Sequence, residues 1–399
     1  MTSSEEFMNI DNEYGAHNYH PIPVVVAKAQ GVFVYDPEGK KYLDCLSAYS
    51  AVNQGHLHPK IVQALKNQLD RVALTSRAFH NDRMGLFLKH LLDVCGDGFD
   101  MALPMNTGAE AVETAIKMVR RWGYEVKKVE QNKAEIIVCE NNFHGRTTTI
   151  VGFSTDPVAN TNYGPYTPGF TIIPYDDPEA LEAAINPNTV AFLVEPIQGE
   201  AGVIVPSEGY LKKVREICTK HNILLVLDEI QTGFCRTGKM FCHQHEGIVP
   251  DVMTLGKALG GGLLPVSAVV SRKEIMQVFT PGSHGSTFGG FPLACAVGDA
   301  ALDVLVEEKL AERSAELGAY FLGELRKIEH PRIKEVRGKG LFTAVELHEK
   351  ARPYTEQIIN EGILAKETHD FAIRFAPPLV ITKEQLDWAL AIIKRVLSS

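Results

Sequence analysis

Between about residue 58 and residue 275 the chain alternates between short apolar runs and helix-like runs, and this alternation limits the fold more than any other feature. It predicts a mostly parallel sheet covered by helices. Runs without polar residues suit strands that are buried on both faces. We therefore predict an α/β fold. The clearest strand-like runs are 136–139, 171–174, 190–194 and 223–227, and the clearest helix-like runs are 109–121 and 210–221.

The two ends of the chain depart from this alternation. The run Gly31–Gly39 predicts a hairpin with its turn at Asp36–Gly39. After residue 291 we expect one long helix from Pro292 towards Ile328, strand-like segments and a closing amphipathic helix. These segments predict a smaller α+β domain shared by both ends of the chain. The later segments are strands at 338–347 and 372–375 and a helix at 383–397.

The predicted domain organisation follows from these patterns. Residues 1–50 form an N-terminal segment of the small domain, 51–290 form a large domain, and 291–399 form the C-terminal part of the small domain.

Charge and cysteine usage exclude several classes of protein. The chain has 40 Lys and Arg against 49 Asp and Glu, a net charge of −9 that disfavours a nucleic-acid-binding surface. No apolar run approaches the roughly 18 residues that a membrane span needs. The seven cysteines include no CxxC pair, and no basic residue precedes Lys28, so we expect a cytoplasmic protein without a signal peptide. We expect no structural metal, because the spacing of Cys235, Cys242, His243 and His245 fits no usual zinc pattern. A redox pairing of Cys235 with Cys242 stays open.

Lys257 is the only charged residue between residues 252 and 271. Glycines flank it, and its other neighbours are mostly apolar. Burial disfavours the ammonium form and lowers the pKa of a lysine, and a neutral amine attacks aldehydes. The alternative is a lysine at a helix end whose ammonium group reaches the surface.

Two further features complement this lysine. Asp228 follows the buried run 223–227, and open α/β sheets bind ligands at the carboxyl ends of their strands. Thr107 and Gly108 precede a helix, whose N-terminus favours an anion. Pyridoxal 5′-phosphate needs an amine to bind its aldehyde, an acid to pair with its ring nitrogen and a site for its phosphate. Lys257, Asp228 and the helix start at Thr107 and Gly108 would supply these three groups. Taken singly, Asp228 is a loop residue, and Thr107 with Glu110 is a plain capping box.

A competing pattern spans Gly233–Lys239, which matches the first seven positions of a GxxxxGK phosphate-binding loop. Met240 stands where Ser or Thr would hold Mg²⁺, and a poor helix start follows it. A nucleotide hydrolase is therefore the remote alternative.

Six motifs, in order along the chain, resemble those of the class-III pyridoxal-phosphate-dependent aminotransferases, which have fold type I. The resemblance extends over essentially the whole chain. Two more segments, 14–21 and 47–55, resemble the members of this family that act on ornithine. The six motifs are Asn106–Ala111, Phe143–Arg146, Glu195–Glu200, Asp228–Gly233, Gly256–Leu259 and Gly285–Gly290.

The resemblance implies roles around the cofactor. Lys257 would bind the aldehyde and then move a proton between substrate and cofactor, and Asp228 would pair with the ring nitrogen. Gln231 would bind the phenolic oxygen, and Phe143 would stack on the ring. Thr287 would reach the phosphate bound in the neighbouring subunit, which implies an obligate homodimer with composite sites. The remaining cofactor-binding residues would be Thr107, Gly108, Ala109, His144 and Ser286.

The resemblance also implies that the chain transfers the terminal amine of ornithine to 2-oxoglutarate. Ornithine has no carboxylate beside its reacting carbon, whereas 2-oxoglutarate has one, so a pocket cation must be masked in one half-reaction and free in the other. Arg374 would be that cation and Glu200 its mask. Arg146 would bind the distal carboxylate. Tyr19 and Tyr49 would line the pocket, with Tyr19 reaching the α-amino group.

A few positions depart from the family pattern. Phe291 stands where Asn is usual, which affects the contacts of its loop, and Phe234 and Cys235 replace Leu and Gly. His144 stands where some relatives have Trp, which affects the width of the pocket. Acetylornithine or 4-aminobutyrate transamination is the alternative within the family. A non-catalytic metabolite-binding homologue is another alternative, against which Lys257 argues.

Overall fold

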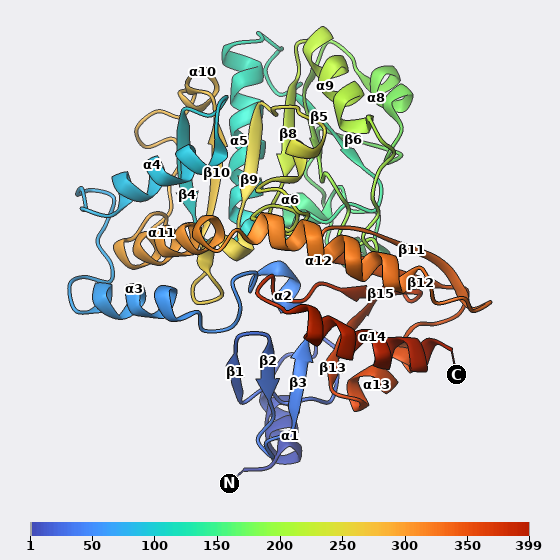
Figure 1. The fold of residues 1–399 in the computed structure, drawn as a ribbon. Helices are drawn as coiled ribbons and strands as arrows, with labels where there is room; N and C mark the ends of the chain where they lie inside the picture. The colour runs from blue at the N-terminus through green and yellow to red at the C-terminus, as the bar shows by residue number, and fades with distance from the viewer. Residues whose placement is uncertain (1, 399) are drawn as a thin grey trace.

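The computed structural model describes residues 2–398 and is built around a seven-stranded sheet (Figure 1). The strand order is β4-β10-β9-β8-β7-β5-β6. β10 is antiparallel to both of its neighbours, and the pairs from β9 to β6 are parallel. The prediction of an α/β fold with a mostly parallel sheet is confirmed. The strands are β4 (Met101–Met105), β5 (Glu135–Cys139), β6 (Phe170–Ile173), β7 (Thr189–Val194), β8 (Leu224–Asp228), β9 (Val252–Leu255) and β10 (Ser267–Ser271).

Helices cover both faces of this sheet, because its central strands carry apolar side chains on both sides. In β7, Leu193 packs into the cluster that includes α5, whereas Phe192 and Val194 pack into the cluster under α8 and α9. Every residue of β7, β8 and β9 is buried. The helices are α5 (Gly108–Glu125), α8 (Pro178–Ala184) and α9 (Tyr210–Lys220), with short helical segments α6 (Thr148–Val151), α7 (Pro157–Asn160) and α10 (Lys273–Met276) and the 3₁₀ turns η1 (Cys242–His245) and η2 (Lys257–Gly260).

Segments from both ends of the chain lie together below the large sheet in the view of Figure 1. β1, β2 and β3 pair antiparallel, and the late strand β13 joins them by pairing in parallel with β3. The predicted hairpin turn at Asp36–Gly39 is confirmed, with Gly39 at a φ of 88°. A second sheet has the order β11-β12-β15-β14. The strands are β1 (Lys28–Gln30), β2 (Phe33–Tyr35), β3 (Lys41–Asp44), β11 (Ile333–Lys339), β12 (Phe342–Leu347), β13 (Ile363–Leu364), β14 (Lys366–Thr368) and β15 (Ala372–Phe375).

The structure differs from the sequence predictions in three places. The expected single helix after Pro292 is two helices, α11 (Pro292–Glu307) and α12 (Leu310–Leu325), because Lys309 between them adopts a left-handed φ of 52°. The expected strand at 338–347 is interrupted by a turn at Gly340, with a φ of 60°, so that its first residues belong to β11. The helix α1 (Ser4–Tyr14) was not predicted, although a capping box starts it.

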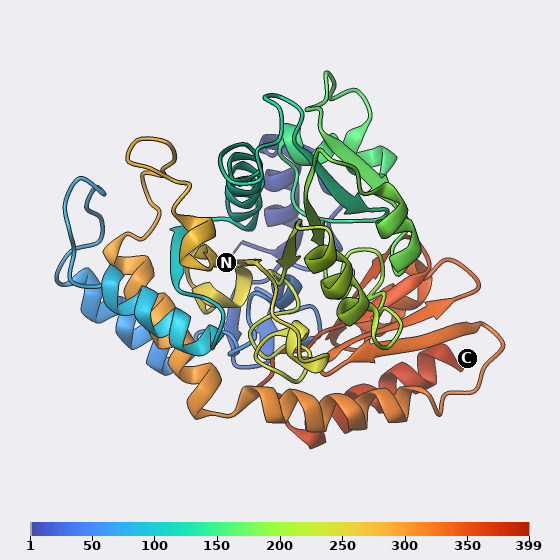
Figure 2. The same ribbon diagram turned by 90° about the horizontal axis from the view of Figure 1, so that it is seen from above.

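α11 and α12 connect the two parts of the molecule. α11 packs against α3 (Pro59–Leu69) and α4 (Met84–Cys95), whereas α12 packs against β11 and α14 (Lys383–Leu397). Figure 2 shows α12 and α14 running along one side of the molecule, and α13 (Arg352–Asn360) packs on α14. The predicted division at residues 50 and 290 stays a prediction.

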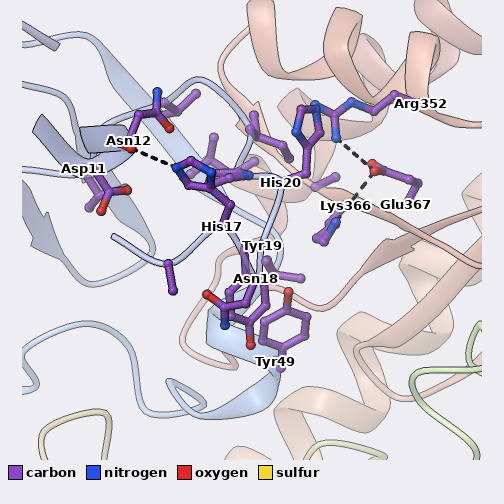
Figure 3. A pocket seen from close by; sticks show the side chains of 18 residues that line it. Asp11, Asn12, His17, Asn18, Tyr19, His20, Tyr49, Arg352, Lys366 and Glu367 are labelled. Atoms are coloured by element: carbon purple, nitrogen blue, oxygen red, sulfur yellow. Dashed lines mark hydrogen bonds and ion pairs between the residues drawn. The ribbon is translucent and has the colours of Figure 1, made fainter. Parts of the chain in front are cut away.

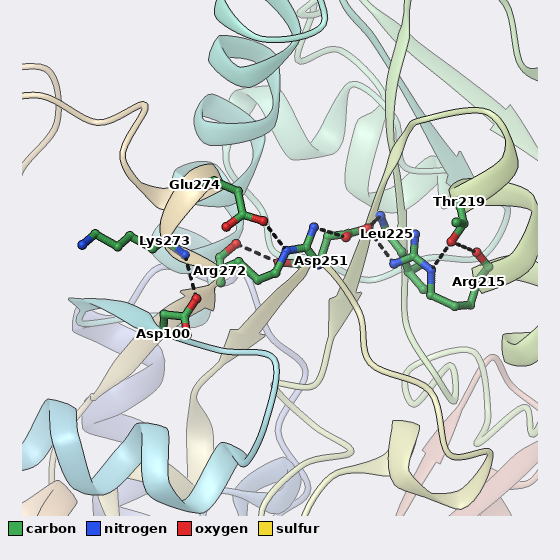
Figure 4. Close-up of polar contacts among 9 residues, drawn as sticks. Asp100, Arg215, Thr219, Leu225, Asp251, Arg272, Lys273 and Glu274 are labelled. Atoms are coloured by element: carbon green, nitrogen blue, oxygen red, sulfur yellow. Dashed lines mark hydrogen bonds and ion pairs between the residues drawn. The ribbon is translucent and has the colours of Figure 1, made fainter.

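A buried carboxylate, Asp251, joins strand ends at the edge of the sheet opposite to the carboxyl ends of β8 and β9 (Figure 4). Its Oδ2 accepts hydrogen bonds from Nη1 of Arg215 at 2.6 Å and from the backbone N–H of Leu225 at 2.7 Å. Its Oδ1 lies 2.9 Å from Nη2 of Arg272. One side chain therefore accepts hydrogen bonds or ion pairs from two guanidinium groups and from a backbone N–H near the start of β8.

Asp251→Ala is expected to lower the free energy of unfolding by about 3 kcal/mol, because two cations and an amide lose a buried acceptor. Urea unfolding measures this loss. Asp93→Ala is the control, since Asp93 pairs with Lys89 on an exposed helix face, and its loss should stay within about 0.5 kcal/mol. Equal losses in the two variants would contradict a structural role for the Asp251 cluster.

Candidate active site

A cavity of about 200 Å³ lies at the carboxyl ends of β7, β8 and β9. The residues that line it come from the start of α5, the loop after β5 and the ends of these three strands. Seven of the ten residues predicted to bind the cofactor line this cavity, namely Gly108, Ala109, Phe143, His144, Asp228, Gln231 and Lys257.

Lys257 is the second residue after β9, and its side chain lines the cavity. Its φ is 47°, a left-handed conformation that is uncommon for residues other than glycine and is often found at functional sites. Burial lowers the pKa of Lys257, and the charge of Glu200 opposes this change only in part. The Lys257 amine is therefore neutral at a lower pH than a surface lysine, as nucleophilic attack on an aldehyde requires.

Asp228 ends β8 and presents a fixed carboxylate. Its Oδ2 lies 2.6 Å from Nδ1 of His144, and its Oδ1 accepts the backbone N–H of Ile230 at 3.1 Å. Burial by itself would lower the pKa of His144, but the hydrogen bond and the negative charge of Asp228 outweigh it, so the pKa is raised. The contact between His144 and Asp228 was not predicted.

Glu195 is a second acid at this cavity that the sequence analysis did not identify as a site residue. Burial raises its pKa to about 7, against the opposing charge of His144. Its Oε2 accepts the backbone N–H of Phe143 at 3.0 Å, which holds the loop that carries the aromatic ring. The signal available in the sequence was its position directly after the buried strand β7.

The first turn of α5 forms the opposite wall. Thr107 accepts the N–H of Glu110 at 3.2 Å, and Glu110 accepts the N–H of Thr107 at 2.7 Å, which is the predicted capping box. The next amides, those of Gly108 and Ala109, belong to the first turn, whose N–H groups have no partner within the helix. A Cβ on Gly108 would lie 3.0 Å from Ile230 Cδ1, so a larger residue would fit only if the Ile230 side chain shifted.

These groups fit pyridoxal 5′-phosphate. The first-turn amides of α5, the Asp228 carboxylate and the Lys257 amine line one cavity, and they match in chemistry a phosphate, a ring nitrogen and an aldehyde. The side-chain oxygen of Gln231 lies only 1.5 Å from where a Cβ on Gly199 would be, so Gly199 is required for Gln231 to reach the cavity.

Glu200 and Arg374 form an ion pair beside this cavity. Oε1 of Glu200 lies 2.8 Å from Nη1 of Arg374, which is only 2% exposed. Burial would raise the pKa of Glu200, but the charges of Arg374 and Lys257 outweigh it, so the pKa is lowered. Gln231 donates to the same Glu200 oxygen at 3.4 Å, which links the pair to the cavity. Glu200 is therefore ionised and paired with Arg374.

The two predicted tyrosines share a second cavity, of about 580 Å³, between the N-terminal segment and the strands β13 and β14 (Figure 3). Tyr49 belongs to α2 (Ser47–Ser50), whose four residues all have positive φ, and the guanidinium of Arg374 lies 4.8 Å from its ring centre. Tyr19 is 71% exposed and lies beside Tyr49 in Figure 3.

Eight of the fifteen predicted site residues do not line the first cavity, and Arg146, Ser286 and Thr287 are the ones among them not yet placed. Arg146 is exposed, with its guanidinium 5.7 Å from the ring centre of Phe143. Ser286 accepts a hydrogen bond from the Asn106 side chain at 2.9 Å, directly before Thr107. Thr287 is exposed, and no contact brings it to the cavity within the described part of its own chain.

The Gly233–Lys239 segment does not form a phosphate-binding loop. Arg236 in it is fully buried and donates to the carbonyl oxygens of Leu341 at 2.8 Å and Pro377 at 2.7 Å, and also to the side chain of Asn53. The segment continues into a short 3₁₀ turn and not into a helix. The segment that matches the pattern therefore has a structural role, because the buried Arg236 side chain hydrogen-bonds to three distant parts of the chain.

The seven cysteines all lie within the described residues, and each is a buried, unpaired thiol. Within residues 2–398, no group of three or more His, Cys, Asp or Glu side chains could hold a metal ion. No helix in the same range is long and apolar enough to cross a membrane.

A lysine after β9, an acid at the end of β8 and a helix N-terminus on an α/β sheet are the parts that a pyridoxal-phosphate enzyme requires. The sequence model of the family "Aminotransferase class-III" matches residues 14–397. The chain belongs to the class-III aminotransferase family.

Relatives within the family agree with this assignment. An ornithine aminotransferase of Brevibacillus brevis is 61% identical and covers 100% of this chain and 99% of its own length. The crystal structure of ornithine aminotransferase from Toxoplasma gondii has a TM-score of 0.98 at 46% identity, covering 100% of this chain and 95% of that one. An acetylornithine aminotransferase structure from Elizabethkingia anophelis has a TM-score of 0.91 at 51% identity, covering 100% of this chain and 99% of that one.

Proposed function

We propose that the chain transfers the δ-amino group of L-ornithine to 2-oxoglutarate. The products are glutamate and glutamate-5-semialdehyde, which cyclises to pyrroline-5-carboxylate. The observation that carries this proposal is the ion pair between the half-buried Glu200 and the buried Arg374, 2.8 Å apart beside the Lys257 cavity. Such a pair offers no free cation to ornithine but supplies one to 2-oxoglutarate once Glu200 moves away.

Pyridoxal 5′-phosphate is the proposed cofactor, and when bound it would supply an electron sink that stabilises negative charge at the reacting carbon of the substrate. Lys257 and Asp228 would hold its aldehyde and ring nitrogen, Gln231 its phenolic oxygen, and Phe143 would pack on the ring. Thr107, Gly108, Ala109, His144 and Ser286 would complete its surroundings. The Lys257 amine, once released, would take the proton from the reacting carbon of the substrate and deliver it to the adjoining carbon of the cofactor.

Arg374→Gln is expected to raise the KM for 2-oxoglutarate at least about twentyfold, because a buried, charge-assisted contact to the carboxylate is lost. The half-reaction with ornithine should change much less. Single-turnover rates of the two half-reactions measure the difference. Arg121→Gln is the control, since Arg121 also pairs with a glutamate, Glu125, but lines neither of the two cavities. An equal slowing of both half-reactions would rule out the masking role.

Tyr19 is proposed to read the free α-amino group of ornithine, while Arg146 binds its α-carboxylate and Tyr49 lines the pocket. Tyr19→Phe is expected to lower the preference for ornithine over N-acetylornithine about tenfold, through the loss of one hydrogen bond to a charged group. The kcat/KM values for ornithine, N-acetylornithine and 4-aminobutyrate measure it. Tyr14→Phe in the same segment, with Tyr14 79% exposed, is the control. If the wild-type protein has a higher kcat/KM for N-acetylornithine than for ornithine, the result would favour the alternative that the chain is an acetylornithine aminotransferase.

A homodimer with composite sites, in which Thr287 reaches the partner's phosphate, is also proposed. Exposed apolar side chains next to Thr287 support it, since contiguous apolar patches mark interfaces. Phe288 is 48% exposed. Arg77 donates a hydrogen bond to the Gly289 carbonyl, and the segment around Arg77 carries further exposed apolar side chains. Seven unpaired thiols support a cytoplasmic setting. The exposed apolar residues in and beside the segment around Arg77 are Leu69, Val72, Leu74, Phe79 and Leu86.

A further inference from the structure

His144 has a buried side chain with one polar contact in the described part of the chain. Its side chain is 0% exposed, and its Nδ1 lies 2.6 Å from Oδ2 of Asp228. An ionised carboxylate only accepts hydrogen bonds, so Nδ1 carries the proton and donates it. His144 Nε2 is buried without a hydrogen-bond partner, so within the described residues the contact with Asp228 is the side-chain hydrogen bond that orients the ring, which also packs near Phe153.

This contact completes the support of Asp228. One carboxylate oxygen is held by His144 and the other by the backbone N–H of Ile230, at 2.6 Å and 3.1 Å. With both oxygens held, the plane of the carboxylate is fixed before any ligand enters the cavity. A group that is already held in its binding orientation loses less conformational entropy when the ligand binds, so the ligand binds more strongly.

The charges around His144 favour the same arrangement. Asp228 at the end of β8 and Glu195 after β7 are the acids whose fields act on it, and they favour its protonated form over the effect of burial. The Nδ1–H donor is present in the neutral ring as well as in the charged one, so the support does not depend on which of the two is populated.

We propose that His144 is a positioning residue that holds the Asp228 carboxylate in the orientation needed to receive a protonated ring nitrogen. The inference rests on the proposed cofactor and adds a role that differs from contact with the ring. It predicts that what matters at position 144 is a hydrogen-bond donor at the Nδ1 position, and not the size or aromatic character of the side chain.

The test uses the cofactor-free protein and 4′-deoxypyridoxine 5′-phosphate, which has the ring nitrogen and phosphate but no aldehyde for Lys257. Isothermal titration gives its Kd. His144→Leu is expected to raise the Kd about tenfold, whereas His144→Asn, whose amide places a donor near the Nδ1 position, should stay within about threefold. Inorganic phosphate, which has no ring, should bind both variants as it binds the wild type.

His243→Leu and His243→Asn are the matched controls. His243 is equally buried, and its Nδ1 lies 2.7 Å from the carbonyl oxygen of Ile248, but it does not line the cavity. Both control variants should bind the probe with wild-type affinity. Wild-type affinity in His144→Leu, or equal losses in His144→Leu and His144→Asn, would overturn the inference while leaving the proposed function intact. A wild-type protein that does not bind the probe would overturn the proposed function as well.

If His144→Leu does not fold, the wild-type protein decides the question by NMR. The Nδ1–H signal of His144 should be protected from exchange in the cofactor-free protein and should shift when the probe is added, but not when inorganic phosphate is added. A signal that does not respond to the probe overturns the inference.

Discussion

Lys257→Ala is expected to lower the rate of amino transfer from ornithine at least about a thousandfold, and to leave a folded protein. The variant loses both the amine that condenses with the aldehyde and the group that moves the proton, and general acid–base groups alone contribute about 10²–10⁴-fold. Lys257 is the lysine that lines the cavity at the ends of β8 and β9, so no neighbouring amine replaces it. Steady-state kcat with ornithine and 2-oxoglutarate measures the loss.

Lys127→Ala is the matched control for this experiment. Burial also lowers the pKa of Lys127, but its Nζ donates to the Thr189 carbonyl at 2.6 Å, away from the cavity. Its kcat should stay within about threefold of the wild type, since it takes no part in proton transfer. A Lys257→Ala variant that keeps a tenth of the wild-type kcat would contradict the proposed role of Lys257.

Asp228→Asn is expected to lower kcat at least about a hundredfold and also to destabilise the protein. Its effect on activity comes from the loss of the negative charge that would keep the cofactor ring nitrogen protonated. Its effect on stability comes from His144, which is left in a fully buried site without its anionic partner. Breaking such a buried pair costs about 3 kcal/mol or more.

The pH dependence of this second effect has a definite sign. Because Asp228 raises the pKa of His144 in the folded protein, the pair contributes fully below the unfolded value and less as the pH rises through the folded value. The destabilisation by Asp228→Asn should therefore be larger at pH 6 than at pH 9 when measured by urea unfolding. Asp299→Asn removes the partner of the more exposed His90 and should leave kcat unchanged. A destabilisation that grows with pH would contradict a charged His144.

The parts of the fold set by local sequence could be predicted, and the exceptions have local causes. The apolar runs predicted the buried strands β5, β7 and β8 because strands covered on both faces need continuous apolar residues. The break between α11 and α12 was missed because Lys309 takes a left-handed conformation that its residue type does not signal. The helix α1 was missed because none of its residues is buried, so its apolar pattern is weak.

The candidate site also has parts that local sequence could predict and parts that it could not. Asp228 ends a strand, and Lys257 and the capping box at Thr107 come shortly after one, so their placement at one edge of the sheet follows from the fold class. The contact between His144 and Asp228 joins residues 84 positions apart, and no local pattern encodes such a pair. The Glu200–Arg374 pair spans 174 positions and was expected only because of the family resemblance.

The absorbance spectrum of the protein loaded with pyridoxal 5′-phosphate is the measurement that tests the central claim most directly. The account predicts a visible band that L-ornithine bleaches, that 2-oxoglutarate restores, and that Lys257→Ala lacks. N-acetylornithine and 4-aminobutyrate should bleach it far more slowly. A wild-type protein with no visible band, or with a band that ornithine leaves unchanged, would contradict the account.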